Sequence, residues 1–346
     1  MEPKREITSV GLSALVGELG AYCGATVDKA YLYPEDLIRL KMRDYERGRI
    51  ELLIQVGERK RVHDTDPEFL PQAPDRPPNF AKMLRNRIAG ADLASVSQHG
   101  FDRILEFEFR RGDADTTIVA ELFGEGNIAV LDENGTVIDS LSTVRLRSRS
   151  VAPGAQYGFP QTRVNPIELE EAAFAQVMND SDTDVVRTLA TQLNLGGTYA
   201  EELCTRAGVE KELPIEAATD AEYERIYAEM TALFDRLSAG DTDPRVYRDD
   251  DQPVDVSPIP LQEYADLESE AYDSFNAALD AYFRSLPAED GAERASESGP
   301  NFQAEIDKRE RIIAQQEQAI DDFTTEAERV REKAEALYAH CGLVDE

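Results

Sequence analysis

Alternating apolar and polar positions dominate the first 150 residues and predict β-strands. In residues 102–109, DRILEFEF, the side chains of Leu105, Phe107 and Phe109 alternate with polar positions, the period-two pattern of a strand with one buried face. Similar runs predict strands at 26–33, 36–42, 49–56, 60–64, 92–98, 116–123, 127–132 and 136–141. Asn134-Gly135 predicts a hairpin turn between the last two.

Two segments of helical spacing interrupt this strand-rich part. Residues 9–22 place apolar side chains on one face, with Ser9 as a candidate N-cap. Residues 79–90, NFAKMLRNRIAG, combine an apolar face with three cations and end at Gly90. Few helices among many antiparallel strands indicate an α+β domain.

From residue 166 onward the spacing predicts mainly helices, at 166–178, 183–194, 218–238 and 263–286. Residues 240–253 form a predicted charged loop, and 288–300 a low-complexity linker. In 193–209 the pair Gly196-Gly197 separates two helices, as in a helix-hairpin-helix whose second helix offers free N–H groups to a phosphate. A plain helix connection with a C-cap glycine fits equally, and the acids Glu201 and Glu202 weaken the phosphate interpretation.

Residues 301–346 carry a heptad pattern that predicts a coiled-coil helix. One position repeats every seventh residue and is always apolar: Ile306, Ile313, Ile320, Ala327, Ala334 and Cys341. A single amphipathic helix cannot bury its own seam. The helix therefore needs either a second copy or a return helix that follows Glu346, and the sequence favours a fragment of a longer protein.

Charge is distributed unevenly along the chain. The net charge is −32 over 346 residues, a length that suggests two or three domains. Residues 1–111 hold 18 basic and 18 acidic residues, whereas 151–346 hold 16 and 44. The comparatively basic first part is the expected place for an anionic partner, and the acidity of the rest is typical of adaptation to high salt.

Several classes of function find no support in the sequence. Three scattered cysteines give neither a disulfide framework nor a zinc motif, and the chain begins without a signal peptide, so a cytoplasmic location is expected. No apolar run is long enough to span a membrane. Glycine-rich nucleotide loops and metal-ligand histidine spacing are missing, so no cofactor and no catalytic site are expected.

Asp102 and Arg103 stand side by side at the start of a predicted strand. Taken alone, such a pair is more often a solvated strand end than a binding site. Further cations, Lys82, Arg85 and Arg87, lie together on the predicted helix 79–90.

Several stretches together resemble the NFACT family, the ribosome quality-control tailing factors known as NEMF in eukaryotes and RqcH in bacteria and formerly called fibronectin-binding proteins. The most specific is PPNFAKMLRNRIAGADLASVSQHGFDRILEFEF at 77–109. The others include residues 12–31, 121–138 and 258–283, the run from Arg149 to Pro160, the glycine hairpin and the start of the coiled coil. The resemblance covers nearly the whole chain and, with the acidity, suggests the N-terminal half of a halophilic archaeal member.

The resemblance implies an architecture. Residues 1–160 would form an N-terminal domain similar to that of formamidopyrimidine-DNA glycosylases, and 161–240 a helix-hairpin-helix domain. Residues 241–300, including helix 263–286, would connect these to the coiled-coil arm that begins at 301.

The resemblance also implies a function. Such proteins bind large ribosomal subunits obstructed by peptidyl-tRNA, hold tRNA, alanyl-tRNA included, and support C-terminal tailing of the stalled chain with alanine, while the ribosome performs the peptide transfer. The family's functional Asp-Arg pair falls on Asp102-Arg103. Arg103 would contact a phosphate or base, and Asp102 would orient Arg103 or accept from a ribose or base edge. The residues expected to bind RNA are Gln98, Asp102, Arg103, Lys82, Arg85, Arg87 and Arg149.

The chain departs from the family pattern in its first helix, and other functions compete with this one. The family's acid in that helix is replaced by Gly11, which puts an acid-dependent contact there in doubt. DNA base excision fails because Glu2 and Pro3 do not match the glycosylase start and only three cysteines exist. A surface adhesin lacks the expected signal peptide. A glycosylase-like nucleic-acid-binding module, or a coiled-coil scaffold without tailing activity, remains the alternative.

Overall fold

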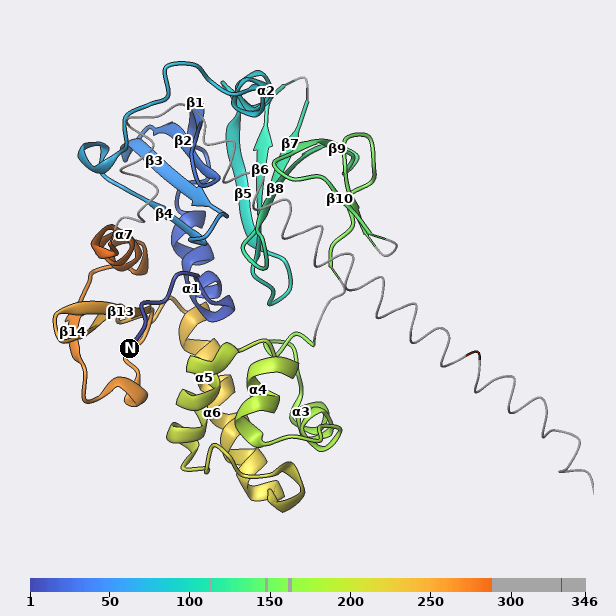
Figure 1. The fold of residues 1–346 in the computed structure, drawn as a ribbon, viewed down its shortest axis with the longest axis vertical. Coiled ribbons are helices and arrows are strands. Elements are labelled where there is room, and N and C mark those ends of the chain that lie inside the picture. The colour runs from blue at the N-terminus through green and yellow to red at the C-terminus, as the bar shows by residue number, and fades with distance from the viewer. Residues whose placement is uncertain (113, 147–148, 161–163, 288–330, 332–346) are drawn as a thin grey trace, which may run out of the picture. The chain divides into compact units, whose positions relative to one another are not determined.

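The computed structural model describes residues 1–112, 114–146, 149–160, 164–287 and Arg331 (Figure 1). Residues Met1–Leu286 form one compact unit, and Pro287–Glu346 are assigned to a second. The predicted linker 288–300 and the coiled-coil helix 301–346 lie outside the described residues, apart from Arg331.

Nine antiparallel strands form the main sheet, in the order β4-β3-β2-β1-β5-β6-β7-β8-β9. The strands of the first half are β1 (Thr26–Tyr33), β2 (Leu37–Asp44), β3 (Gly48–Gln55) and β4 (Arg61–Asp64). The second half contains β5 (Asp92–Gln98), β6 (Ile104–Arg110), β7 (Thr116–Glu121), β8 (Asn127–Asp132) and β9 (Val137–Ser140). Strands β1 and β5 share a single register pair, Thr26 with Asp92, so the sheet consists of two well-paired halves.

The predicted alternation in the second half of the sheet is confirmed. Leu105, Phe107 and Phe109 on β6 are buried in the main core, which also contains apolar side chains of α1 (Ser9–Gly20). Burying each such side chain stabilises the fold by about 1.5–3 kcal/mol. The strand begins at Ile104, two residues later than predicted, and residues 99–103 form the preceding turn.

The N-cap of helix α1 is Thr8 and not the predicted Ser9. The Thr8 side chain accepts a hydrogen bond from the N–H of Gly11 at 2.9 Å, so the predicted cap Ser9 is the first helical residue. Helix α2 (Asn79–Ile88) packs against β1, and η1 (Pro67–Phe69) precedes it. Short strands β10 (Val144–Arg145) and β11 (Ser150–Val151) pair beyond β9.

The helical region follows the sequence prediction with shifted ends. It contains α3 (Glu171–Asn179), α4 (Val185–Gln192), α5 (Gly196–Ala207), η2 (Ile215–Ala217) and α6 (Asp220–Ser238). Helix α6 opens with a capping box between Thr219 and Glu222 and contacts α1. Figure 1 shows these helices gathered beside α1, with the two sheet halves on the other side of it.

Two predictions for residues 240–286 need correction. The charged loop 240–253 contains β12 (Arg245–Asp249) and the start of β13 (Gln252–Ser257), joined by Asp250 and Asp251 in left-handed conformation. Aspartate tolerates this conformation, so an acidic run can form a tight hairpin turn.

The second correction concerns the helix predicted at 263–286. The structure has η3 (Gln262–Tyr264), β14 (Glu268–Ala271) and only then α7 (Phe275–Ser285). Pairing of β14 with β12 overrides the local helical propensity, and Ser274 begins the helix by accepting from the N–H of Ala277. Among the described residues, no helix is both long and apolar enough to cross a membrane.

Candidate functional site

The Asp102-Arg103 pair lies in the turn between β5 and β6. The N–H of His99 donates to the carbonyl of Ile104 and the N–H of Asp102 to the carbonyl of His99, each at 3.0 Å. Phe101 anchors the turn, because its ring is buried against Phe234 of α6 in an edge-to-face contact. The two charged side chains are therefore held at a defined end of the sheet without belonging to a strand.

Arg103 forms an ion pair with Glu6, a residue of the N-terminal segment. Nη1 of Arg103 donates to Oε2 of Glu6, and Lys60 donates to Oε1 of the same carboxylate at 2.6 Å. Partial burial opposes ionisation of Glu6, but the hydrogen bonds from Lys60 and Arg103 outweigh it and lower the pKa of Glu6. The Arg103 side chain is 28% exposed, and its other nitrogen atoms make no hydrogen bond within the described part of the chain.

Asp102 is tied to the turn between α4 and α5. Asn194 Nδ2 donates to Oδ1 of Asp102 at 3.0 Å and to the carbonyl of Phe101 at 3.1 Å. The side-chain amide of Gln98 donates to the carbonyls of Asp102 and Ser9, at 2.9 and 3.1 Å, and so links the turn to α1. We call Gln98, Asp102 and Arg103 the Asp102-Arg103 junction. The structure thus brings together three predicted residues, Gln98, Asp102 and Arg103.

Sequence reasoning missed Glu6 and Asn194. Nothing in the sequence marks Glu6, which is 97 positions from its partner Arg103. The sequence around Asn194, in contrast, contained a signal that could have marked this residue. It directly precedes the Leu195-Gly196 step and adopts φ +55°, a conformation that asparagine reaches more readily than most residues.

The N-terminus of α5 is exposed and has no side-chain cap. Gly196 and Gly197 are exposed, the capping position Leu195 contributes no side-chain hydrogen bond, and a Cβ on either glycine would meet no atom within 4 Å. Lys4 lies nearby, because its Nζ donates to Oγ1 of Thr198 at 3.2 Å. Lys4 is itself paired with the buried carboxylate of Asp255 at 2.8 Å, so it is the free N–H groups of the helix start that suit an anion.

The acids that weakened the phosphate interpretation point elsewhere. Glu202 is buried, pairs with Arg206 at 2.6 Å and accepts the N–H groups of Gln262 and Glu263. Glu201 pairs with Lys211 at 3.0 Å. Neither carboxylate is therefore committed to the exposed start of α5.

The three cations of α2 occupy the opposite end of the sheet. Strand β5 starts just after α2 and leads to Gln98, a distance of about 20 Å at 3.3 Å per residue. Arg85 donates to the carbonyl of Ala30 at 2.7 Å and lies over the Tyr31 ring, whereas Lys82 is exposed and Arg87 partly exposed. Lys82, Arg85 and Arg87 do not form one site with Asp102 and Arg103.

Arg149 lies near the turn but makes internal contacts. It pairs with Glu121, which is opposite Ile104 in the sheet, and donates to the carbonyl of Gly158 at 2.8 Å. The Tyr157 hydroxyl donates to the same carboxylate at 2.7 Å. Burial lowers the pKa of Arg149, whose side chain is 10% exposed. This geometry gives Arg149 a role in anchoring the segment 149–160.

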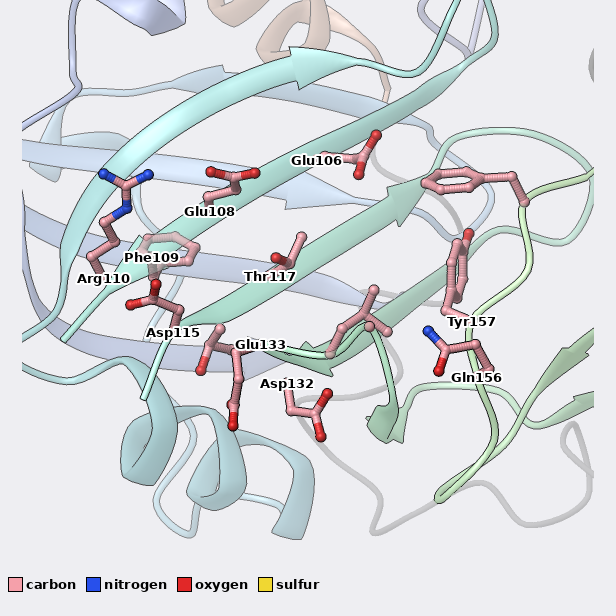
Figure 2. A pocket seen from close by; sticks show the side chains of 14 residues that line it. Glu106, Glu108, Phe109, Arg110, Asp115, Thr117, Asp132, Glu133, Gln156 and Tyr157 are labelled. Atoms are coloured by element: carbon pink, nitrogen blue, oxygen red, sulfur yellow. The ribbon is translucent and has the colours of Figure 1, made fainter. Parts of the chain in front are cut away.

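A cavity of about 360 Å³ lies on the outer face of β6, β7 and β8 (Figure 2). Its lining is rich in carboxylates, with Glu106 and Glu108 on β6 and Asp132 and Glu133 at the end of β8. No group of three metal-ligating side chains occurs in the described ranges. The acidic lining disfavours a phosphate ligand, and neither Asp102 nor Arg103 lines the cavity.

Comparisons with known proteins agree with one another. A family model described as NFACT N-terminal and middle domains matches residues 8–346. The archaeal Rqc2 homolog aRqcH of Methanocaldococcus jannaschii is 32% identical over 352 residues, covering 99% of this chain and 51% of that protein. The human ribosome quality control complex subunit NEMF is 30% identical over 141 residues, covering 40% of this chain and 12% of that protein. The chain spans about half the length of the archaeal relative.

Solved structures support the fold. A fibrinogen-binding protein of Staphylococcus aureus matches with a TM-score of 0.67 at 21% identity, over 80% of this chain and 98% of that one. The N-terminal part of a Streptococcus suis fibronectin/fibrinogen-binding protein gives 0.64 at 22% identity, over 80% and 99%. The mixed helix-and-sheet architecture is thereby confirmed, while similarity to DNA glycosylases stays a prediction. With a family model spanning nearly all of its residues and an archaeal RqcH homologue at 32% identity, this chain belongs to the NFACT family.

Proposed function

We propose that this chain is the RNA-contacting N-terminal half of a cytoplasmic ribosome quality-control factor. Relatives whose names place them in the ribosome quality control complex, the human and Drosophila melanogaster NEMF subunits, support the proposal. In this role the protein binds large ribosomal subunits obstructed by peptidyl-tRNA and holds tRNA. It supports alanine-type tailing by positioning its partners, and the ribosome carries out the peptide transfer.

The observation that carries the proposal is the geometry of Arg103. One guanidinium nitrogen is held by Glu6, while the turn itself is fixed by Phe101 and Asn194. The remaining N–H donors of a partly exposed guanidinium suit a phosphate or a base edge. A preorganised arginine loses little conformational freedom on binding, which favours contact with RNA.

In this proposal the main role of Asp102 is to hold the β5–β6 turn against the α4–α5 connection. Its carboxylate accepts from Asn194 and so couples the sheet to the α4–α5 connection. We assign this connection to a helix-hairpin-helix, with Gly196 and Gly197 approaching an RNA phosphate. Residues 1–160 and 161–240 are then two adjacent RNA-binding domains, and the segment from 301 is the start of the coiled-coil arm.

A side chain at position 11 would be crowded in this protein. A Cβ on Gly11 would lie 3.1 Å from Ile7 and 3.3 Å from the ring of Phe275, so an aspartate there requires these neighbours to move. Glu6 instead supplies a carboxylate beside Arg103.

Binding of fluorescently labelled tRNA tests the proposal. Arg103→Gln is expected to weaken binding by about tenfold, because a specific arginine contact contributes about 1–3 kcal/mol. The matched control is Arg236→Gln, because Arg236 is also a partly exposed arginine, paired at 3.2 Å with Asp241. Equal affinities for wild type and Arg103→Gln would contradict the assignment of Arg103, and absence of binding by wild type would contradict RNA binding by this half.

A further inference from the structure

The tip of the β2–β3 hairpin, residues 43–49, exposes one aromatic side chain among three arginines. Its sequence is RDYERGR, and the Tyr45 side chain is fully exposed, with a relative accessible area of 102%. Arg43 and Arg47 are exposed on either side of it, and the Arg43 side chain is 71% accessible. Phe69 is the other exposed aromatic residue of the described ranges, and the guanidinium carbon of Arg284 lies 3.6 Å from the centre of its ring.

The conformation of the tip is fixed by its own acid. Oδ1 of Asp44 accepts the N–H groups of Glu46 and Arg47, at 2.8 and 2.7 Å, and Gly48 closes the turn at φ +77°. These backbone hydrogen bonds, that of Arg47 first, lower the pKa of Asp44. Asp44 therefore serves the turn, and Tyr45 is presented by a turn whose backbone is hydrogen-bonded to that carboxylate.

Basic side chains continue from the tip along one face of the sheet. Lys41 and Arg43 lie on the same face of β2, and Lys29 of β1 is the register partner of Lys41 in the sheet. One carboxylate, Asp28, lies 3.0 Å from Arg43 and 3.6 Å from Lys41. Glu51 is buried and already paired with Arg39 and Arg49. The exposed Glu46 adds a further carboxylate at the tip, but Lys29, Lys41, Arg43 and Arg47 still outnumber Asp28 and Glu46, although the whole chain carries a net charge of −32.

This surface is distinct from the Asp102-Arg103 junction. Arg43 pairs in register with Thr26, and Thr26 with Asp92 at the start of β5. Asp102 follows the other end of β5, about 20 Å away at 3.3 Å per residue. A ligand that reached both places would have to extend along the sheet, as an RNA strand can.

We propose that the β2–β3 tip is a second RNA contact, which stacks an unpaired base on Tyr45 and binds flanking phosphates through Arg43 and Arg47. The inference rests on the proposed function for the choice of RNA as partner. Exposed aromatic rings interleaved with cations are the combination that binds single-stranded RNA without sequence preference. Stacking tolerates any base, so this contact adds affinity while the junction positions the RNA.

The test is binding of a labelled 12-nucleotide oligouridine and of labelled tRNA, each titrated over potassium chloride concentration. Tyr45→Ala is expected to weaken oligouridine binding about fivefold or more, because a base–aromatic stack is lost. Tyr45→Phe retains the ring and should bind as wild type. The double variant Arg43→Gln/Arg47→Gln should reduce the slope of log affinity against log salt by about 1.4, about 0.7 for each phosphate contact. Arg49 is left intact because it pairs with buried Glu51.

Arg103→Gln, measured in parallel, separates this inference from the proposed function. If Tyr45→Ala and the double arginine variant bind both RNAs as wild type while Arg103→Gln loses tRNA, the tip is not an RNA contact and the proposed function stands. If wild type binds neither RNA, both are overturned. Loss of affinity in Tyr45→Ala but not in Tyr45→Phe, together with the reduced salt slope, supports the tip as an RNA contact.

Discussion

Replacing Asn194 by alanine removes the contact that joins the β5–β6 turn to the α4–α5 connection. The hydrogen bonds lost include one to the carboxylate of Asp102 at 3.0 Å and one to the carbonyl of Phe101 at 3.1 Å. The substitution also places alanine at φ +55°, where its Cβ is strained. We therefore expect Asn194→Ala to lower the free energy of unfolding of the chain.

Three contributions set the magnitude of this loss. A hydrogen bond to a backbone carbonyl contributes about 1 kcal/mol, and one to a partly exposed carboxylate about the same after competition with water. The left-handed backbone adds about 1 kcal/mol for alanine. The expected loss is about 3 kcal/mol, which lowers the melting temperature by about 6 °C at roughly 2 °C per kcal/mol.

Chemical denaturation of four variants separates the contributions. Asn194→Gly keeps the backbone unstrained and should lose about 1 kcal/mol less than Asn194→Ala. Asp102→Ala and the double variant Asp102→Ala/Asn194→Ala close a cycle whose expected coupling energy is about 1 kcal/mol. Additive losses with no coupling, or an Asn194→Ala protein within about 0.5 kcal/mol of wild type, would show that Asn194 and Asp102 do not stabilise each other.

Two further predictions concern other parts of the fold. Gly11→Asp should destabilise the chain by about 1–3 kcal/mol through overpacking against Phe275, and Gly11→Ala by less; urea unfolding in which Gly11→Asp equals wild type would contradict the packing. Burial lowers the pKa of His63 to about 3, with like charge from Arg61 adding to the effect. Between that value and the ordinary 6.5 the unfolded chain binds the extra proton, so stability should fall by about 1.4 kcal/mol per unit as pH drops below about 6.5. His63→Gln should remove this part of the slope between about pH 3 and 6.5, and an unchanged slope would count against it.

The sequence was most informative where local patterns decide structure. Alternation located β6, because Phe107 and Phe109 need a common core face whatever else surrounds them. It failed for β14, whose four side chains are all exposed and whose strand conformation depends on pairing with β12. A segment that owes its conformation to a distant partner carries no periodic signal of its own.

The candidate site was predictable only in part, for the same reason. A family resemblance could point to Asp102 and Arg103, but their partners Glu6 and Asn194 lie more than 90 positions away. The cations expected to bind RNA lie at two ends of β5, with Lys82, Arg85 and Arg87 near its start and Arg103 after its end. Residue type alone does not give such positions. Sequence named the charged groups, and the fold determined which of them lie together.

Co-sedimentation with purified large ribosomal subunits tests the central claim most directly. The measured quantity is the fraction of this chain that pellets with subunits carrying peptidyl-tRNA, compared with empty subunits and with the Arg103→Gln variant. Wild type is expected to pellet preferentially with the tRNA-bearing subunits, and Arg103→Gln is expected to lose this preference. Equal pelleting of wild type with empty and tRNA-bearing subunits, or an unchanged preference in Arg103→Gln, would contradict it.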